Sequence, residues 1–477
     1  MHWLSELLAA LRRPSIQIAL IVASAMFMQN LDSTIIVTAL PAMAHSFATN
    51  ESRVSEGITA YALAAAVCIP ASAWLADRIG TRTLFCAAIA IFTLASMACG
   101  LAGGFTAFLA ARLVQGGSAA MMGPVGRMIV LRNTERRELM ATLSMLVWPA
   151  LLAPVIGPAL GGFITDALSW RWIFYVNVPV GALAMALVLA MIPNHRASEH
   201  SRFDALGFVL LAAAVGCLSY ALDLLAGQHL ETTLAIALLL AAAAGGYAAV
   251  RHLEAASQPL VPLAVLRQKA FRVATVSGGG LSRAAISATP FLLPMMLELV
   301  YGLSPLKSGL LLLVYMLANL LMKVATNPII RRFGLRRVLI VNGALTACGI
   351  AACAWISPQL PAALVVIILL FAGASRSMQF TALTFTTFAE ISTEERAPAS
   401  VLSSLTQQIA VAAGVASAAL MLNLARLGQH ALVLSALDFR IALTLMAGIA
   451  ALALIAYRSL PANTGAEVSG HQPAAAR

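Results

Sequence analysis

The stretch "NLDSTIIVTALP", residues 30–41, decides the fold, because it places an aspartate inside an apolar run that begins near Ile16. An apolar run of about 20 residues crosses a bilayer as a helix. A charged carboxylate near the middle of such a helix costs about 2.5–3.5 kcal/mol on insertion scales, so it is seldom present without a use. Asp32 therefore indicates a membrane helix with a functional acid inside it.

Composition extends this prediction to the whole chain. The 477 residues are 61% hydrophobic and only 10% charged, and the mean hydropathy is +0.89, whereas a soluble domain has about 25% charged residues. The formal net charge is +11, but the basic residues punctuate apolar segments instead of clustering on one folded face, so no nucleic-acid partner is expected. The chain is predicted to be an all-α polytopic membrane protein, with the lipid bilayer around it and a small molecule as substrate.

Fourteen apolar segments are long enough to cross the bilayer as helices. An even number places both termini on one side, and most of the 30 Lys and Arg residues fall in the loops of that side. Cytoplasmic loops carry such an excess, so both termini are expected to be cytoplasmic. The expected spans are residues 16–40, 54–76, 82–102, 105–130, 140–165, 172–193, 204–225, 232–250, 272–299, 305–328, 336–356, 361–389, 398–424 and 437–459.

An internal repeat divides the chain. "LADRIGTR" (residues 75–82) follows the second expected span and is echoed by "IIRRFGLRR" (residues 329–337) after the tenth. Two helical halves related by a parallel repeat are a transporter architecture, with the substrate site between them. The predicted organisation is 6 + 2 + 6 helices: residues 1–195 form the first half, 196–255 two inserted central helices, 256–462 the second half, and 463–477 a disordered cytoplasmic tail.

The loop after the second span carries the first family resemblance. Asp77, Arg78, Gly80 and Arg82 match the major facilitator superfamily signature Gly-x-Leu-Ala-Asp-Arg-x-Gly-x-Arg/Lys, with Ala73 in place of the first glycine. The resemblance implies a gate latch, in which the aspartate pairs with an arginine and the pair breaks when the halves rock. The alternative is an ordinary solvated loop with cytoplasmic positive charge.

The fourth span resembles the same superfamily. "RLVQGGSAA" (residues 112–120) is similar to its Arg-x-x-Gln-Gly-x-Gly-x-Ala pattern, with Ser118 where the second glycine is expected. Arg112 would need a carboxylate or carbonyl partner inside the membrane, and the resemblance implies a role for it in proton or substrate coupling, with Gln115 and Gly116 in the conformational motif. A structural arginine that snorkels to the outer interface is the alternative.

The fifth span contains "PVIGPALGG" (residues 154–162), which resembles the antiporter motif Gly-Pro-x-x-Gly-Gly of exporters in this superfamily. Its motif residues here are Gly157, Pro158, Gly161 and Gly162. Gly157 and Gly161 form a GxxxG pair on one helix face, which permits close helix contact.

Two further stretches narrow the resemblance to the fourteen-span drug:proton antiporter family. "SWRWIFYVNVPVG" (residues 169–181) and "LDSTIIVTALP" (residues 31–41) match its patterns, and Trp170 and Trp172 are expected to anchor the chain at the outer interface. "RSMQFTALTF" (residues 376–385) and "SSLTQQIAVAAGVA" (residues 403–416) resemble a bacterial subgroup, the MdtD-like multidrug transporters. The resemblance implies a multi-pass protein of the bacterial inner membrane, and leaves open whether a periplasmic adaptor binds it.

Asp32 is the candidate for proton coupling. Burial favours the protonated form of a carboxyl group, whereas a nearby arginine favours its ionised form. Opening and closing of the site would therefore make Asp32 bind and release a proton. The alternative is an acid permanently paired with a buried arginine to hold helices together. Six further polar residues within spans are candidates for the cavity wall: Gln29, Asn30, Arg283, Arg376, Gln379 and Gln407. Helix–helix hydrogen bonding explains the amides nearly as well, and a gate or packing role is the alternative for the two arginines. Lys323 is expected to snorkel to the headgroups.

No sequence feature supports catalysis. The chain has no GxxxxGK[ST] phosphate-binding loop, no metal-ligand spacing of His or Cys, and no other cofactor motif. The predicted function is proton-coupled export of amphipathic drugs or metabolites by alternating access, with the proton as coupling ion. A solute:proton symporter or facilitator of the same fold, and a non-transporting membrane sensor or scaffold, remain alternatives.

Overall fold

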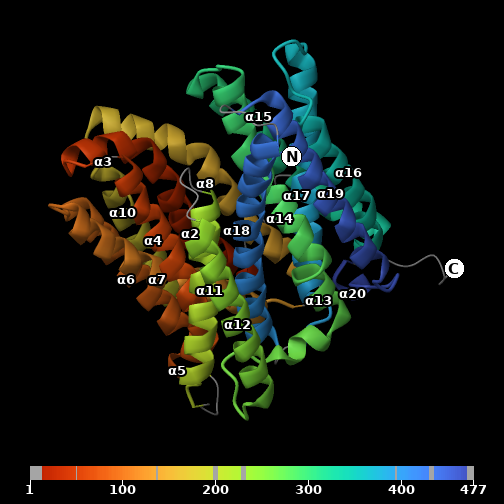
Figure 1. Ribbon diagram of the computed structural model, residues 1–477. Coiled ribbons are helices and arrows are strands. Elements are labelled where there is room, and N and C mark those ends of the chain that lie inside the picture. Colours follow the sequence, from red (N-terminus) through yellow and green to blue (C-terminus); the bar gives the residue numbers. More distant parts are fainter. Residues whose placement is uncertain are drawn as a thin grey trace, which may run out of the picture. The chain divides into compact units, whose positions relative to one another are not determined.

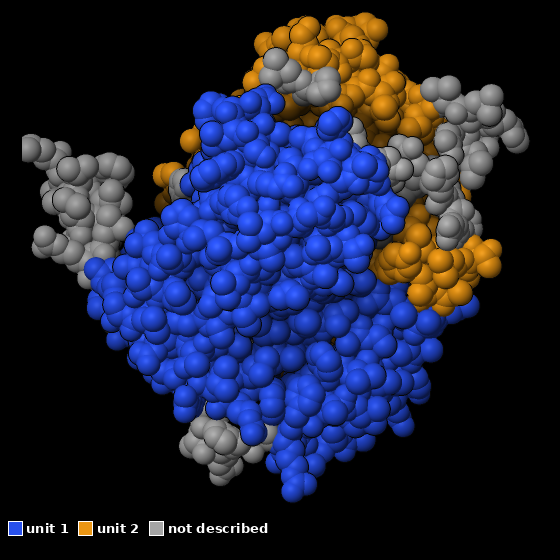
Figure 2. All heavy atoms as spheres, turned by 90° about the vertical axis from the view of Figure 1, so that its left-hand side faces the viewer, with its two compact units in different colours: residues 1–217, 240–263, 393–405 blue, residues 218–239, 264–392, 406–477 orange. Residues whose placement is uncertain are grey.

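The computed structural model describes residues 13–49, 51–135, 138–196, 202–226, 232–392, 395–428 and 434–469, and every regular element in them is helical (Figure 1). Long apolar segments form these helices because a helix satisfies its own backbone hydrogen bonds, as a lipid environment requires. The chain forms two compact units, shown in different colours in Figure 2. Unit 1 comprises residues 1–217, 240–263 and 393–405, and unit 2 comprises residues 218–239, 264–392 and 406–477.

Unit 1 contains the candidate proton-coupling residues. Its elements are α2 (Pro14–Ile35), η1 (Ile36–Ala39), α3 (Leu40–Ser46), α4 (Glu51–Cys68), η2 (Ile69–Ala71), α5 (Ser72–Ile79), α6 (Thr81–Leu101), α7 (Phe105–Arg132), α8 (Leu139–Ala167), α9 (Trp172–Tyr175), α10 (Asn177–Met191), and parts of α11 (Ala205–Ala226), α12 (Thr232–Ala255) and α18 (Arg396–Gly428). Within it, α2 packs along α8, α4 along α7, and α6 along both α7 and α10.

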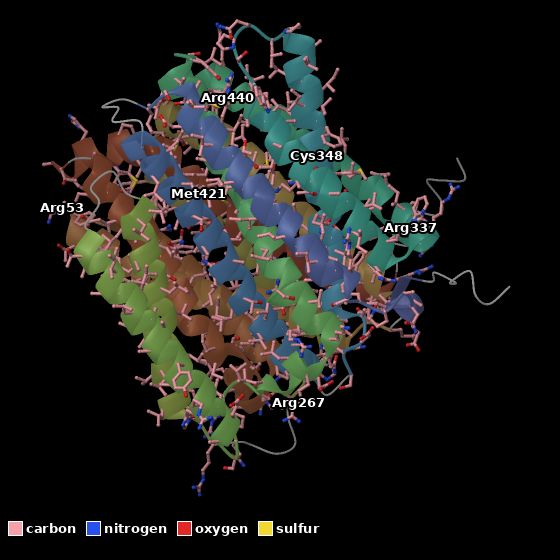
Figure 3. All side chains as sticks on the ribbon, turned by 45° about the vertical axis from the view of Figure 1, so that its right-hand side comes forward. Arg53, Arg267, Arg337, Cys348, Met421 and Arg440 are labelled. Carbon is pink, nitrogen blue, oxygen red and sulfur yellow. The ribbon has the colours of Figure 1, made fainter. Side chains whose placement is uncertain are left out.

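Unit 2 contains the remaining elements. They are η3 (Leu263–Arg267), which starts at the unit boundary, α13 (Lys269–Thr275), α14 (Gly278–Met295), the π-helical η4 (Met296–Val300), α15 (Pro305–Phe333), α16 (Leu335–Cys353), α17 (Ala362–Phe388), most of α18, α19 (Ala436–Arg458) and α20 (Ala466–Ser469). Here α15 packs along α17, and α16 packs along α17 and α19. Figure 3 shows Arg337 near the start of α16 and Cys348 farther along the same helix.

The sequence repeat is also a structural repeat. Gly80 joins α5 to α6 with φ 95° and ψ 145°, and Gly334 joins α15 to α16 with φ 76° and ψ 157°. Positive φ values disfavour side chains with a Cβ, which explains a glycine in each echo. Each unit thus makes the same sharp helix-to-helix turn at the same place in its motif.

The expected spans all coincide with helices, and twelve helices among the described residues are long and apolar enough to cross a membrane. Helices α7 and α8 are not among those twelve. Helix α7 carries Arg112, Arg127 and Arg132, which reduce its mean hydropathy. The fourteen-span count, the cytoplasmic termini and the division at residues 195 and 255 stay predictions. Residues 470–477 of the predicted tail lie outside the described residues, and Ala466–Ser469 form α20.

One of the two tryptophans expected at the membrane interface is buried instead. Trp172 is 50% exposed, as an interfacial anchor requires, but Trp170 is only 4% exposed. Its ring makes edge contacts with Phe47 and Phe174, with centroids 5.3 and 6.2 Å away. Trp170 is therefore a core residue of unit 1, because the turn before α9 directs it inward between α3 and α9.

Candidate functional site

Asp32 is the centre of a buried polar network in unit 1. Its carboxylate Oδ2 accepts a hydrogen bond from Arg112 Nη1 at 2.7 Å, and both side chains are fully buried. Its Oδ1 accepts one bond from Gln115 Nε2 at 2.8 Å and another from Asn177 Nδ2 at 2.9 Å. Three helices, α2, α7 and α10, therefore meet at one carboxylate.

Arg112 reaches Asp32 because α7 lies against both α2 and α4. Its Nε donates to the Gly57 carbonyl at 3.2 Å, and its guanidinium lies over the Tyr61 ring, 4.4 Å from the centroid. Gln115, one turn along α7, accepts a bond from Arg112 Nη1 at 2.7 Å. Arg112 has no exposed surface, so the structure does not support the alternative of an arginine that snorkels to the interface.

Close helix contact brings the network together. A Cβ at Gly116 would lie 2.2 Å from the Tyr61 carbonyl oxygen, so only glycine lets α7 approach the backbone of α4 this closely. The motif pattern around residues 115–116 is thus explained by two requirements: a polar side chain that faces Asp32 and no side chain that faces α4.

Asn177 is the network residue that the sequence analysis missed. It is 2% exposed at the start of α10, and its Nδ2 also donates to Ser96 Oγ at 2.9 Å. Ser96 in turn donates to the Phe174 carbonyl at 3.0 Å. The asparagine belongs to the stretch "SWRWIFYVNVPVG", in which the sequence analysis assigns a role only to Trp170 and Trp172.

The electrostatics of this network match a negative charge on Asp32. Three donors, one of them an arginine, surround its two oxygens, while Arg112 Nη2 has no hydrogen-bond partner among the described residues. Charge-assisted hydrogen bonds are roughly twice as strong as neutral ones.

The predicted gate motif forms contacts at the Gly80 turn. Asp77 Oδ1 pairs with Arg132 Nη2 at 3.1 Å, which joins the end of α5 to the end of α7. A Cβ on Gly80 would lie 2.2 Å from Asn194 Oδ1, and that oxygen accepts the Arg82 backbone N–H at 3.1 Å. Arg78 is exposed and lies over the Trp74 ring. The pairing expected of the aspartate is therefore present, whereas its breaking in a transport cycle stays a prediction.

The antiporter motif places glycines against α2. A Cβ at Gly157 would lie 2.3 Å from Thr34 Oγ1, and one at Gly161 would lie 2.6 Å from the Ile35 carbonyl oxygen. Gly162 has no neighbour within 4 Å of a built Cβ. Pro158 lies within α8, but its side chain is outside the described set. The GxxxG pair thus brings α8 close to α2 only a few residues from Asp32.

Three further cavity candidates, Gln29, Asn30 and Gln407, lie in α2 and α18. Asn30 Nδ2 donates to the Met26 carbonyl of its own helix at 2.7 Å, so this side chain is satisfied locally. Gln29 is half-buried beside the Tyr61 hydroxyl. Gln407 is half-buried in α18. Among the described residues, no hydrogen bond joins Gln29 or Asn30 to the Asp32 carboxylate, and the role of all three side chains in a cavity stays a prediction.

Unit 2 has its own buried polar side chains. Gln379 is fully buried and accepts a bond from Asn342 Nδ2 at 3.0 Å. Arg283 is 2% exposed and donates to the Ala274 carbonyl at 2.7 Å. Arg376 Nη1 lies 3.5 Å from the Tyr315 hydroxyl oxygen. Lys323 is only 7% exposed and donates to Thr381 Oγ1 on α17, so the expectation that it snorkels to the headgroups is wrong.

No group of three His, Cys, Asp or Glu side chains that could hold a metal ion occurs in the described part of the chain. The six cysteines are free thiols on the helices, and none forms a disulfide there. The chemistry of the site is therefore that of a buried ion pair and its hydrogen-bond donors.

Comparison with known families shows a match along nearly the whole chain. Residues 22–415, and again residues 275–475, match the Major Facilitator Superfamily. The sequence is 34% identical over 456 residues to the putative multidrug resistance protein MdtD of Serratia proteamaculans (strain 568), covering 93% of each chain. It is 35% identical to the protein of the same description from Cronobacter sakazakii (strain ATCC BAA-894), covering 84% of this chain and 85% of that one.

Solved structures show the same fold at low sequence identity. The human organic anion transporter MFSD10 superposes with a TM-score of 0.67 at 15% identity, covering 94% of this chain and all of that one. The proton:xylose symporter XylE superposes with a TM-score of 0.66 at 14% identity, covering 94% and 97% of the two chains. The solved structures confirm the all-α fold expected from the sequence. The sequence relatives confirm the MdtD-like resemblance.

Proposed function

Since the chain belongs to the major facilitator superfamily and is therefore a multi-span membrane transporter, we propose that it is a proton-coupled antiporter. In this proposal it exports amphipathic drugs or metabolites across the bacterial inner membrane. The description of its relatives as putative multidrug resistance proteins supports export. The chain's own motif at Gly157 and Gly161, packed against α2, supports it further.

The observation that carries the coupling proposal is the buried Asp32–Arg112 pair. A carboxylate and a guanidinium without solvent exposure are costly in a membrane helix, and such residues mark proton relays and ion pathways. The pair joins α2 to α7, and α2 also packs against the glycine face of α8. A shift of α2 relative to its neighbours would therefore change the charge state that Asp32 can support.

The proposed cycle uses this linkage. When α2 and α7 separate, Asp32 loses the donors from Arg112 and Gln115, and a proton from the outer side neutralises the carboxylate. When the pair forms again, Arg112 replaces the proton, which leaves toward the cytoplasm. In this cycle the proton is bound when the site turns from the outside to the cytoplasm, and substrate is bound when the site turns back. Proton entry down its gradient therefore drives substrate export.

The test is proton movement in sealed inverted vesicles that contain the full-length protein and an acidic lumen. Addition of a transported lipophilic compound should release protons from wild-type vesicles. Asp32→Asn should abolish this release, because an amide cannot carry the proton. Asp166→Asn is the matched control, because Asp166 is exposed at the end of α8.

A second variant separates coupling from structural support. The double change Asp32→Asn with Arg112→Gln removes both charges and leaves no unpaired buried ion. If the pair only holds helices together, this variant should fold and retain substrate-driven proton release. Retention of full proton release by either variant would remove Asp32 from the coupling mechanism.

A further inference from the structure

Two basic side chains, one buried and one partly exposed, lie on adjacent helices of unit 2. Lys323 is halfway along α15, and Arg376 is halfway along α17. These two helices pack along each other. Lys323 is 7% exposed, and Arg376 is partly exposed.

Hydroxyl groups surround this cation pair, and no described carboxylate forms an ion pair with either residue. Lys323 donates to Thr381, and Arg376 lies beside the hydroxyl and over the ring of Tyr315. Phe380 supplies a second ring, 5.6 Å from the Arg376 guanidinium carbon. The cluster is rich in donors and aromatic surface, and the side chains described around it supply no negative charge.

Unit 1 shows what such a cluster looks like when its charge is balanced. Arg112 and Gln115 on α7 repeat the spacing of Arg376 and Gln379 on α17. In unit 1 the arginine and glutamine both bind Asp32 of α2. In unit 2 the corresponding glutamine binds Asn342 instead, and α14 carries no acid between Gly278 and Met295.

We propose that Lys323 and Arg376 form a binding site for the acidic group of an amphipathic organic anion, such as a carboxylate or sulfonate attached to an apolar body. The anion supplies the charge that unit 2 lacks, and Tyr315 and Phe380 contact the apolar body. The inference deepens the proposed export function by naming a substrate class. It rests on that function only for the direction of transport, because binding is measurable without transport.

The experiment measures equilibrium binding of three ring-matched probes to the full-length protein in lipid nanodiscs. The probes are naphthalene-2-sulfonate, 2-naphthylmethanol and 2-naphthylmethyl-trimethylammonium, which share a ring system and differ in charge. The sulfonate should bind saturably and at least about tenfold more tightly than the other two, because two cations attract it in a weakly screened site. Methanesulfonate, which lacks the ring, should not displace it at equal concentration.

Variants assign the binding to these residues. Lys323→Met should weaken sulfonate binding about tenfold or more, whereas Lys307→Met should not change it, since Lys307 is exposed on the same helix. Lys323→Arg should retain most of the affinity. If Lys323→Met does not fold, Arg376→Gln provides the same comparison.

Equal affinity for the cationic probe, or unchanged sulfonate binding in both Lys323→Met and Arg376→Gln, would overturn the inference. Full competition by methanesulfonate would also overturn it, because the site would then accept any small anion. Sulfonate binding that depends on Lys323, without substrate-driven proton release from vesicles, would support the anion site and contradict the antiport proposal.

Discussion

Asn177 shows how one amide supports a buried charge. Its Nδ2 donates to both Asp32 and Ser96, so it links α10 to α2 and α6. An unsatisfied buried polar group costs about 1–3 kcal/mol, and more when it is charged. The residue is therefore expected to matter as much as the motif arginine, although it belongs to none of the polar positions singled out from sequence.

Replacement of Asn177 by leucine should lower both stability and coupling. Asp32 would lose one of three donors, and Ser96 Oγ would lose the bond it accepts from Asn177, so we expect a loss of about 1–3 kcal/mol in unfolding free energy. Substrate-driven proton release in inverted vesicles should fall together with the melting temperature. Asn463→Leu changes an exposed asparagine and serves as the control; unchanged melting and proton release in Asn177→Leu would contradict this role.

Asp204 provides a pH-dependent contact directly before α11, one residue ahead of the membrane-crossing helix as the structure has it. Burial opposes its ionisation, but hydrogen bonds from the Gly207 backbone N–H, from His252 and from the Leu260 backbone N–H outweigh this, and the pKa of Asp204 is lowered. A lowered pKa means that the ionised carboxylate stabilises the folded state above its unfolded-state pKa. That contribution is lost as pH falls through the lowered folded-state pKa.

The consequence is measurable as a difference between two melting curves. Asp204→Ala should cost about 1–2 kcal/mol near neutral pH, because it removes the group that caps α11. The difference from wild type should shrink as the solution is acidified below the lowered pKa of Asp204. A difference that stays constant from neutral to strongly acidic pH would show that the carboxylate's charge is irrelevant.

At the scale of elements, the glycine face of α8 sets its distance from α2. Gly161→Val should push the helices apart, since a Cβ there would lie 2.4 Å from Thr38 Oγ1 and 2.6 Å from a backbone carbonyl. Overpacking of this kind costs about 1–3 kcal/mol. We expect a lower melting temperature and reduced transport.

Gly162→Val is the matched control for this element. It adds the same side chain one residue later, where a built Cβ has no neighbour within 4 Å. We expect its effect on stability to stay within about 0.5 kcal/mol. Equal damage by both variants would show that the contact of Gly161 with α2 is not what limits stability, because valine has a higher helix propensity than glycine at either position.

Sequence patterns predicted the helices well, because long apolar segments and their basic flanks are local features. They also singled out Asp32, Arg112 and Gln115, because each is a polar residue in an apolar setting. Their pairing was not predictable, since Asp32 and Arg112 are 80 residues apart and a charged residue does not specify its partner. Lys323 was misjudged for the same reason: its contact with Thr381 lies on another helix.

At the scale of the whole molecule, orientation in the membrane remains a prediction. The distribution of Lys and Arg places the loop between α6 and α7 outside and the loop after α12 inside. Single reporters at Gly103→Cys and Ser257→Cys, in a chain freed of its native cysteines, test this with a membrane-impermeant maleimide. Gly103→Cys should react in intact cells, and Ser257→Cys only in inverted vesicles.

The reverse labelling pattern would show that the chain is inserted with the opposite orientation. Labelling of both reporters on one side would contradict the expected number of spans between them, which is odd. The readout does not require transport, so it is independent of the proton-coupling and anion-binding proposals.

Asp32 and Arg112 are 80 residues apart in the sequence, which has a consequence for biosynthesis. Ribosomes add about 5–20 residues per second, so the first helix waits about 4–16 s before its arginine has been made. During that interval the acid enters the membrane without its counter-charge, at the insertion cost of a lone carboxylate. The nascent chain is therefore least stable in the membrane before the fourth helix emerges.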